Sequence, residues 1–103
     1  MMRDKIEISV IIPIYNEEST CSNIINKVKK INLVKEIIVV DDASTDSTFE
    51  ILNTIDDINI LKHNTNMGKG AAVRTGLAHA KYNYVITPVS YTHLRAHETR
   101  HDL

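Results

Sequence analysis

Residues 36–48, EIIVVDDASTDST, decide the fold of this chain. A continuous run of mostly β-branched residues ends in two aspartates and a polar turn, which is typical of a strand buried on both faces of a parallel sheet. Residues 6–13 have a similar pattern, and they predict a first strand that Pro13 ends. We therefore expect two buried neighbouring strands, each followed by a polar loop.

Helical spacing of apolar residues separates the expected strands. One helix is predicted from Glu17 to Ile31, and a shorter one follows Ser47, whose spacing to Glu50 is that of a capping box. Further along the chain we expect a strand at 59–62, a helix at 71–80 and a strand at 84–87. This alternation predicts the α/β class, with a Rossmann-like, doubly wound and mostly parallel sheet.

Composition excludes several classes of protein. The chain has 103 residues, and its 12 basic residues nearly balance 13 acidic ones, so no basic field points to nucleic acid. The single cysteine, Cys21, cannot form an internal disulfide, which fits a reducing compartment. No apolar run is long enough to cross a bilayer. We expect one domain with no transmembrane segment, located in the cytoplasm.

The loops after the first two strands carry the candidate binding groups. Tyr15, Asn16 and Glu17 offer an aromatic face, an amide and a carboxylate, without the glycines that a dinucleotide-binding turn needs. Asp41 and Asp42 follow the second strand, and an ionised carboxylate can accept hydrogen bonds from the N–H groups of uracil or guanine. An aspartate pair in this position is also typical of a helix cap or a solvated turn. Together, at one sheet edge, the five residues favour a nucleoside site.

A glycine-rich turn precedes the helix expected at 71–80. The sequence Gly68-Lys69-Gly70 matches neither the Walker A pattern nor GxGxxG. One interpretation is a helix N-terminus with Lys69 and Arg74 near phosphates. The other is a tight turn with two solvated cations, and the sequence leaves both open.

Three ordered motifs resemble those of family-2 glycosyltransferases. They are residues 10–18, VIIPIYNEE, residues 36–48, and residues 66–76, NMGKGAAVRTG, and the resemblance extends from Ile6 to about Thr87. The third motif is most similar to enzymes that transfer mannose or glucose from a nucleotide sugar to a polyprenyl or dolichyl phosphate. The resemblance implies the nucleotide-binding half of a GT-A domain, incomplete here, with a UDP- or GDP-linked sugar as donor. In the longer protein it implies a lipid-phosphate or glycan acceptor, at the cytoplasmic face of a membrane.

The resemblance also assigns site residues. It implies that a nucleoside pocket is lined by five of them, with Asp42 contacting the base or ribose and Asp41 supporting the turn. The pocket residues are Pro13, Tyr15, Glu17, Val40 and Asp42. Asn16, Asp41, Lys69 and Arg74 complete the expected nucleotide-sugar-binding set. No catalytic residue can be named.

The sequence departs from the family after the last expected strand. Family members have an Asp-x-Asp motif there that holds a divalent cation, whereas residues 88–91 read PVSY. We expect Mg²⁺ or Mn²⁺ in the complete parent enzyme, but no residue of this chain supports a metal site. Residues 1–88 are therefore interpreted as the nucleotide-binding part, unable to complete catalysis alone. A non-catalytic nucleotide-binding or interaction module of the same fold is the alternative.

Residues 89–103 are interpreted as a non-native tail, because residues 89–99 resemble one reading frame of a translated sequencing adapter. The tail also contains a zinc-protease-like HExxH pattern from His97 to His101. Only two residues follow it, and His93 would lie about 12 Å from His101 along a helix. A zinc site is therefore not expected.

Overall fold

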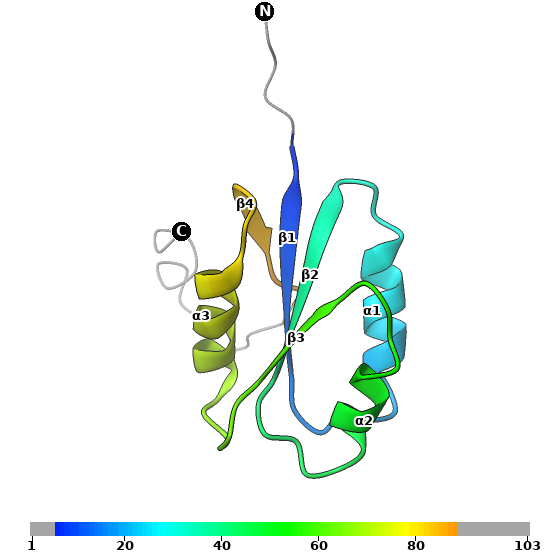
Figure 1. The fold of residues 1–103 in the computed structure, drawn as a ribbon, viewed down its shortest axis with the longest axis vertical. Coiled ribbons are helices and arrows are strands. Elements are labelled where there is room, and N and C mark those ends of the chain that lie inside the picture. The colour runs from blue at the N-terminus through cyan, green and yellow to red at the C-terminus, as the bar shows by residue number, and fades with distance from the viewer. Residues whose placement is uncertain (1–5, 89–103) are drawn as a thin grey trace, which may run out of the picture.

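The computed structural model describes residues 6–88, which form a parallel four-stranded sheet in the order β3-β2-β1-β4 (Figure 1). The predicted α/β class and parallel, doubly wound sheet are confirmed. In chain order the elements are β1 Ile8–Ile14, α1 Cys21–Lys29, β2 Val34–Asp41, α2 Thr48–Leu52, β3 Asn59–Lys62, α3 Lys69–His79 and β4 Tyr84–Ile86. The predicted tail and its His97–His101 pattern lie outside the described residues. The division of the chain at residue 88 stays a prediction.

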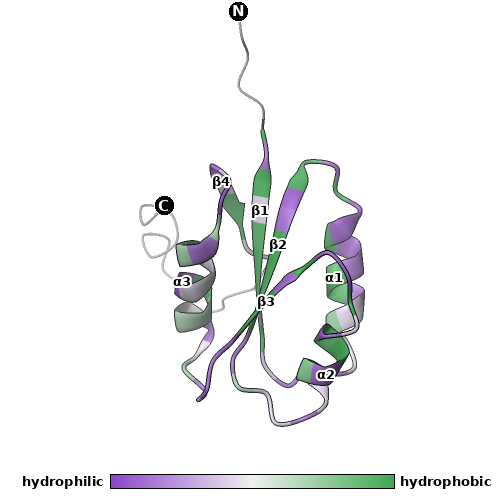
Figure 2. Cartoon of the chain, in the orientation of Figure 1, coloured by the Kyte–Doolittle hydropathy of each residue, from purple (hydrophilic) through white to green (hydrophobic). Residues whose placement is uncertain are grey.

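The two central strands hold the sheet together. β1 and β2 pair in parallel from Ile8 opposite Val34 to Ile14 opposite Asp41. Both strands are apolar along most of their length, as Figure 2 shows, because helices cover both faces of the sheet. The chain therefore buries these strands on two sides, which explains their continuous runs of isoleucine and valine.

Two apolar clusters form the core, one on each face. On the first face, α1 and α2 cover the sheet, and Ile12, Ile25 and Val39 lie in the cluster. On the other face α3 covers Ile11, Ile38 and Val40. The helices stand on opposite sides of the sheet in Figure 1, as a doubly wound topology requires.

Pro13 does not end the first strand, as the sequence predicted. β1 continues to Ile14, and Pro13 lies opposite Val40 of β2. A proline is tolerated where the ladder needs no N–H from it. β4 pairs with β1 only at residues 8–10, so within the described residues the later part of β1 has a strand on one side alone.

The first helix begins four residues later than predicted. α1 starts at Cys21, after a turn in which the Glu17 carbonyl oxygen accepts hydrogen bonds from the backbone N–H groups of Thr20 (3.0 Å) and Cys21 (2.9 Å). Glu18 does not open the helix either, since its carboxylate accepts the N–H of Ser47 at 2.9 Å. Burial raises the pKa of the Cys21 thiol, which packs in the core as a small apolar residue.

The predicted capping box at α2 is also wrong. Ser47 is the N-cap residue but makes no side-chain capping bond. Asp46 provides the acceptor instead, because its Oδ1 accepts the backbone N–H of Thr48 at 2.9 Å. The capping role therefore falls to the preceding residue, as expected for a short acidic side chain at a helix start.

One glycine allows α3 to lie close against the sheet. A Cβ atom added at Gly76 would stand 2.5 Å from Ile11 Cγ2, and Ile11 is fully buried. We expect Gly76→Ala to lower the free energy of unfolding by about 1 to 3 kcal/mol, because overpacking outweighs the roughly 1 kcal/mol gain in helix propensity. Urea unfolding followed by circular dichroism measures the change.

Gly70→Ala, in the same helix, is the matched control. Its added Cβ would lie 3.5 Å from Arg74 Nη1, which is an ordinary contact. This control should leave the protein as stable or stabilise it by up to about 1 kcal/mol. Equal effects of the two substitutions would contradict the close packing of α3 on Ile11.

Candidate functional site

Three polar loops meet at the carboxyl edge of the sheet, which is the lower end of the strands in Figure 1. They follow β1, β2 and β3, because parallel strands end at the same edge. Ile14, Asp41 and Lys62 are the last residues of these strands. The predicted convergence of the first two loops is therefore present, and a third loop, residues 63–68, joins them.

Asn16 joins the first loop to the second. It has a left-handed backbone conformation, with φ of 51°, and its N–H donates to Ser44 Oγ at 2.8 Å. Its side-chain Oδ1 accepts the backbone N–H groups of Thr45 (2.8 Å) and Asp46 (3.3 Å). The Asn16 amide, expected to bind nucleotide, thus holds the loop after β2 in place.

Asp41 supports the turn that follows β2, as predicted. It is fully buried, and its Oδ1 accepts hydrogen bonds from the backbone N–H (3.1 Å) and hydroxyl (2.6 Å) of Ser44. Its other oxygen, Oδ2, is buried without a hydrogen-bond partner among residues 6–88. This Oδ2 can therefore still accept a hydrogen bond at the carboxyl edge.

Asp42 holds the loop that follows β3. Its Oδ1 accepts the N–H of Met67 at 2.8 Å, and its Oδ2 accepts the N–H of Gly68 at 2.7 Å. Its Oδ1 also lies 2.7 Å from Nδ1 of His63. Only 4% of the residue is exposed. The carboxylate predicted to contact a nucleoside therefore also holds the loop after β3 by hydrogen bonds.

The surroundings of Asp42 keep its carboxylate ionised. Burial acts to raise its pKa, but hydrogen bonds from His63, Met67 and Gly68, together with the charge of His63, outweigh burial and lower the pKa below its ordinary value. An ionised carboxylate accepts hydrogen bonds only, and all its partners can donate. The site thus has a fixed negative charge at the end of β2.

Sequence reasoning missed His63 and Thr75. His63 Nε2 lies 2.8 Å from Thr75 Oγ1, so the imidazole stands between the Asp42 carboxylate and a hydroxyl on α3. The position of His63, directly after β3 at the same edge as Asp42, was the available signal. Thr75 gave none, because its contact with His63 depends on how α3 packs.

The remaining predicted site residues differ in exposure. Tyr15 is 44% exposed beside the first loop, and Lys69, the first residue of α3, is exposed next to the Gly68 turn. Arg74 is exposed further along α3, and Pro13 is half-buried. Val40 is fully buried in the core on the α3 side, so its side chain is covered by protein. The structure brings Tyr15, Asp42 and Lys69 to one edge and buries Val40 beneath it.

The described residues do not fit a divalent cation. Between residues 6 and 88, no group of three or more histidine, cysteine, aspartate or glutamate side chains is placed to hold a metal ion. Both oxygens of Asp42 already accept hydrogen bonds from N–H groups. The partial positive charges of these N–H groups would repel a cation bound to the same oxygens. In the same part of the chain, no helix is long and apolar enough to cross a membrane.

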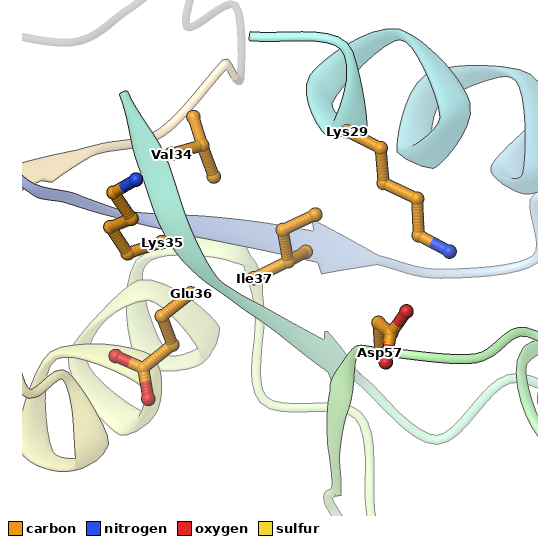
Figure 3. A pocket seen from close by; sticks show the side chains of 6 residues that line it. All are labelled: Lys29, Val34, Lys35, Glu36, Ile37 and Asp57. Atoms are coloured by element: carbon orange, nitrogen blue, oxygen red, sulfur yellow. The ribbon is translucent and has the colours of Figure 1, made fainter. Parts of the chain in front are cut away.

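A shallow hollow lies at the opposite, amino end of the sheet (Figure 3). It is lined by Lys29, Val34, Lys35, Glu36, Ile37 and Asp57. The Lys29 ammonium group donates to the carbonyl oxygen of Asp56 at 2.6 Å. Glu36 is buried and accepts hydrogen bonds from Ser9 Oγ (2.8 Å) and the backbone N–H of Lys81 (3.0 Å). These groups tie the connections at this end to the sheet, away from the predicted site.

The lowered pKa of Asp42 predicts a pH dependence of stability. Because its pKa in the folded state is below the ordinary 3.8, its contribution is present above that value and is lost as the pH falls through the folded pKa. We expect Asp42→Asn to lower the free energy of unfolding by about 1.5 to 3 kcal/mol near neutral pH. The difference in free energy of unfolding between wild type and Asp42→Asn should shrink when the pH falls below the ordinary pKa of 3.8.

Urea unfolding across this pH range measures both effects, and Asp56→Asn is the control because Asp56 is exposed. A difference between wild type and Asp42→Asn that stays constant from neutral to acid pH would contradict the ionised network.

Comparison with known proteins identifies the family of the chain. The family model "Glycosyl transferase family 2" matches residues 9–88. A UDP-N-acetylglucosamine–dolichyl-phosphate N-acetylglucosaminyltransferase of Methanococcus voltae is 35% identical over an alignment of 95 residues. The match covers 77% of this chain and 37% of that protein. A dolichyl-phosphate β-glucosyltransferase of Dictyostelium discoideum is 31% identical, and the match covers 81% of this chain and 30% of that protein. The chain thus spans about a third of the length of these relatives.

Solved structures show the same fold. A mannosyltransferase from Pyrobaculum calidifontis, in complex with GDP-Man and Mn²⁺, has a TM-score of 0.69 and 28% identity, covering 77% of this chain and 26% of that one. A glucosyl-3-phosphoglycerate synthase from Mycobacterium tuberculosis, in complex with Mn²⁺, UDP and glucosyl-3-phosphoglycerate, has a TM-score of 0.66 and 31% identity, covering 79% and 32%. The family match includes all three loops of the carboxyl edge, and on this ground the chain belongs to glycosyltransferase family 2.

Proposed function

We propose that this chain forms the donor-binding half of a glycosyltransferase that takes a sugar from a UDP- or GDP-linked donor. The acceptor of the longer protein is a polyprenyl or dolichyl phosphate or another glycan acceptor. One observation carries the proposal: the family match over residues 9–88 coincides with the convergence of Tyr15, Asp42 and Lys69 at the carboxyl edge of the sheet. That edge is where open α/β sheets bind ligands.

The nucleoside is assigned to the first two loops. Tyr15 exposes its ring beside the edge, and aromatic rings bind bases by stacking. Among residues 6–88, Asp42 Oδ2 accepts one hydrogen bond, from the N–H of Gly68, so it has capacity for a second donor from the base or ribose. Glu17 is half-buried in the same loop, and its Oε1 accepts the Thr20 hydroxyl at 2.6 Å. We assign it a supporting position in the pocket, with Pro13 and the Val40 backbone beneath.

The diphosphate is assigned to the start of α3. This helix begins at Lys69, after Gly68, whose φ of 95° suits glycine and few other residues. A helix N-terminus carries free N–H groups and a partial positive charge, which favour anions. Lys69 adds a full charge at that point, and Arg74 adds a second on the next turn. Of the two interpretations that the sequence left open, we therefore favour phosphate binding.

A divalent cation belongs to the complete enzyme in this proposal. The two solved structures named above both contain Mn²⁺ with a nucleotide or nucleotide sugar, whereas the described residues do not fit such an ion. No step of sugar transfer is therefore assigned to this chain. We further propose a cytoplasmic location, at the cytoplasmic face of a membrane in the longer protein, supported by the unpaired thiol of Cys21 in the core.

Nucleotide binding tests the proposal directly. We expect the chain to bind UDP or GDP weakly, and Tyr15→Ala to lower the affinity about tenfold, because stacking on one base contributes roughly 1 to 3 kcal/mol. Isothermal titration calorimetry with UDP, GDP and the free nucleosides measures this. Tyr84→Ala is the matched control, since Tyr84 is similarly exposed (49%) but pairs with Ile8 at the amino end.

The aspartates provide a second comparison. Asp42→Asn should abolish detectable nucleotide binding, whereas Asp46→Asn, at the helix cap, should leave it unchanged apart from a loss of stability. Wild-type protein that is folded and binds neither UDP nor GDP would overturn the proposed function. Equal affinity of wild type and Tyr15→Ala would overturn the assigned pocket.

Sugar transfer should be absent from the purified chain. Residues 88–91, PVSY, stand where the family's metal-binding carboxylates are expected, so the leaving diphosphate lacks their cation. We expect no release of UDP or GDP from nucleotide sugars above the blank, with or without Mn²⁺. Measurable turnover in a coupled nucleotide-release assay would show that other residues complete the site.

A further inference from the structure

His63 occupies a central position that the proposed nucleotide contacts do not use. Its ring bridges two elements: Nδ1 lies 2.7 Å from Asp42 Oδ1 at the end of β2, and Nε2 lies 2.8 Å from Thr75 Oγ1 on α3. Its side chain is only 10% exposed. The imidazole is therefore held between a carboxylate and a hydroxyl and is largely covered by protein.

The hydrogen-bond partners fix the role of Nδ1. Asp42 accepts the N–H groups of Met67 and Gly68, which requires acceptor oxygens on both sides of its carboxylate. Nδ1 of His63 must therefore carry the hydrogen that points to Asp42, because an ionised carboxylate cannot donate. In the neutral ring, Nε2 is then an acceptor, and the Thr75 hydroxyl donates to it. Nδ1 is thus a donor to Asp42 in the neutral and in the protonated ring alike.

The turn before α3 depends on this bridge. The backbone of Asp42 is fixed independently, since its N–H donates to the Ile14 carbonyl oxygen at 2.8 Å. The turn at Met67 and Gly68 has its N–H groups on the Asp42 side chain instead. If that carboxylate rotates, the Met67–Gly68 turn that is hydrogen-bonded to it moves as well, and so does Lys69, which follows the turn. His63 restrains the carboxylate, and through Thr75 it also ties α3 to the same point.

We propose that His63 is a positioning residue for diphosphate binding, which holds the Asp42 carboxylate so that the Met67–Gly68 turn presents Lys69 and the start of α3 to the phosphates. This inference rests on the proposed function. His63 itself touches no nucleotide in this arrangement. Its effect is larger on the phosphate-binding turn than on the nucleoside pocket, because the Asp42 backbone stays hydrogen-bonded to Ile14 and the nucleoside also stacks on Tyr15 in the proposed site.

An aspartate–histidine–hydroxyl line is also found in nucleophilic hydrolases. Here the histidine is nine-tenths buried, and the aspartate is engaged by two backbone N–H groups of another loop. Thr75 lies within α3 with its hydroxyl against the ring. Both ring nitrogens are already engaged, Nδ1 by Asp42 Oδ1 and Nε2 by Thr75 Oγ1, so we assign these three residues to positioning.

The test compares UDP with uridine in four variants of the chain. His63→Phe removes both hydrogen bonds and keeps a ring, and His63→Asn keeps an amide donor near the position of Nδ1. Thr75→Val removes only the hydroxyl at the other end. His79→Phe is the matched control, because His79 is exposed at the end of α3 and, within the described part of the chain, its Nδ1 hydrogen-bonds only to the Thr75 carbonyl oxygen, at 3.0 Å. Thermal unfolding establishes that each variant is folded.

We expect His63→Phe to lower the affinity for UDP about tenfold, the effect of one charge-assisted hydrogen bond, and that for uridine by less than about threefold. His63→Asn should recover most of the UDP affinity. The UDP affinity of Thr75→Val should lie between those of wild type and His63→Phe, and that of His79→Phe should equal wild type. Equal weakening of UDP and uridine binding by His63→Phe, or none, would overturn the inference.

Amide hydrogen exchange measured by NMR supplies a readout that needs no nucleotide. Protection of the Met67 and Gly68 amides should fall in His63→Phe and persist in His63→Asn. Unchanged protection in His63→Phe would overturn the inference even if UDP binds. A wild-type chain that binds neither UDP nor GDP, but loses this protection on substitution, would refute the proposed function while leaving His63 as the residue that holds the turn.

Discussion

The parallel pairing of β1 with β2 is the constraint on which the rest of the structure depends. Because these strands run in the same direction and end together at Ile14 and Asp41, the loops that follow them must emerge at one edge. Helices on both faces make the middle of the two strands apolar, so the polar residues lie near the strand ends, with Ser9 and Glu36 near the amino ends and Asp41 at the carboxyl end of β2. Burial and polarity thus place the binding groups without any need for a separate binding domain.

Side chains, more than regular structure, organise that edge. Asn16 accepts N–H groups of the second loop, and Asp42 accepts those of the third, so each loop is held by a residue from another strand end. Buried N–H groups without partners are costly, and these two acceptors supply partners where no ladder or helix can. The arrangement gives a firm edge, and Tyr15 and Lys69 are among the exposed residues on it. It also means that residues expected only to bind a ligand have a structural role.

Much of the fold could be predicted from local pattern. The β3 strand was predicted with its observed bounds, and the parallel order follows from the alternation of strands and helices. The errors lie at element ends, where a tertiary contact decides. The Glu18 carboxylate binds the N–H of Ser47, a residue 29 positions away, so it could not be assigned to that loop from the spacing around it. The bridge from Asp42 through His63 to Thr75 was missed for the same reason, since it joins three segments that only the packed sheet brings together.

If the carboxyl edge of the sheet is the nucleotide site, nucleotide binding must perturb the residues of its loops, which chemical-shift mapping measures. Backbone amide shifts of isotope-labelled protein would be recorded while UDP or GDP is added. We expect the largest changes in the loop at Tyr15, in the turn at Ser44 and around Gly68 and Lys69. This assignment of the site would be contradicted if the largest changes fell at the amino end of the sheet, around the hollow lined by Lys29 and Lys35 (Figure 3).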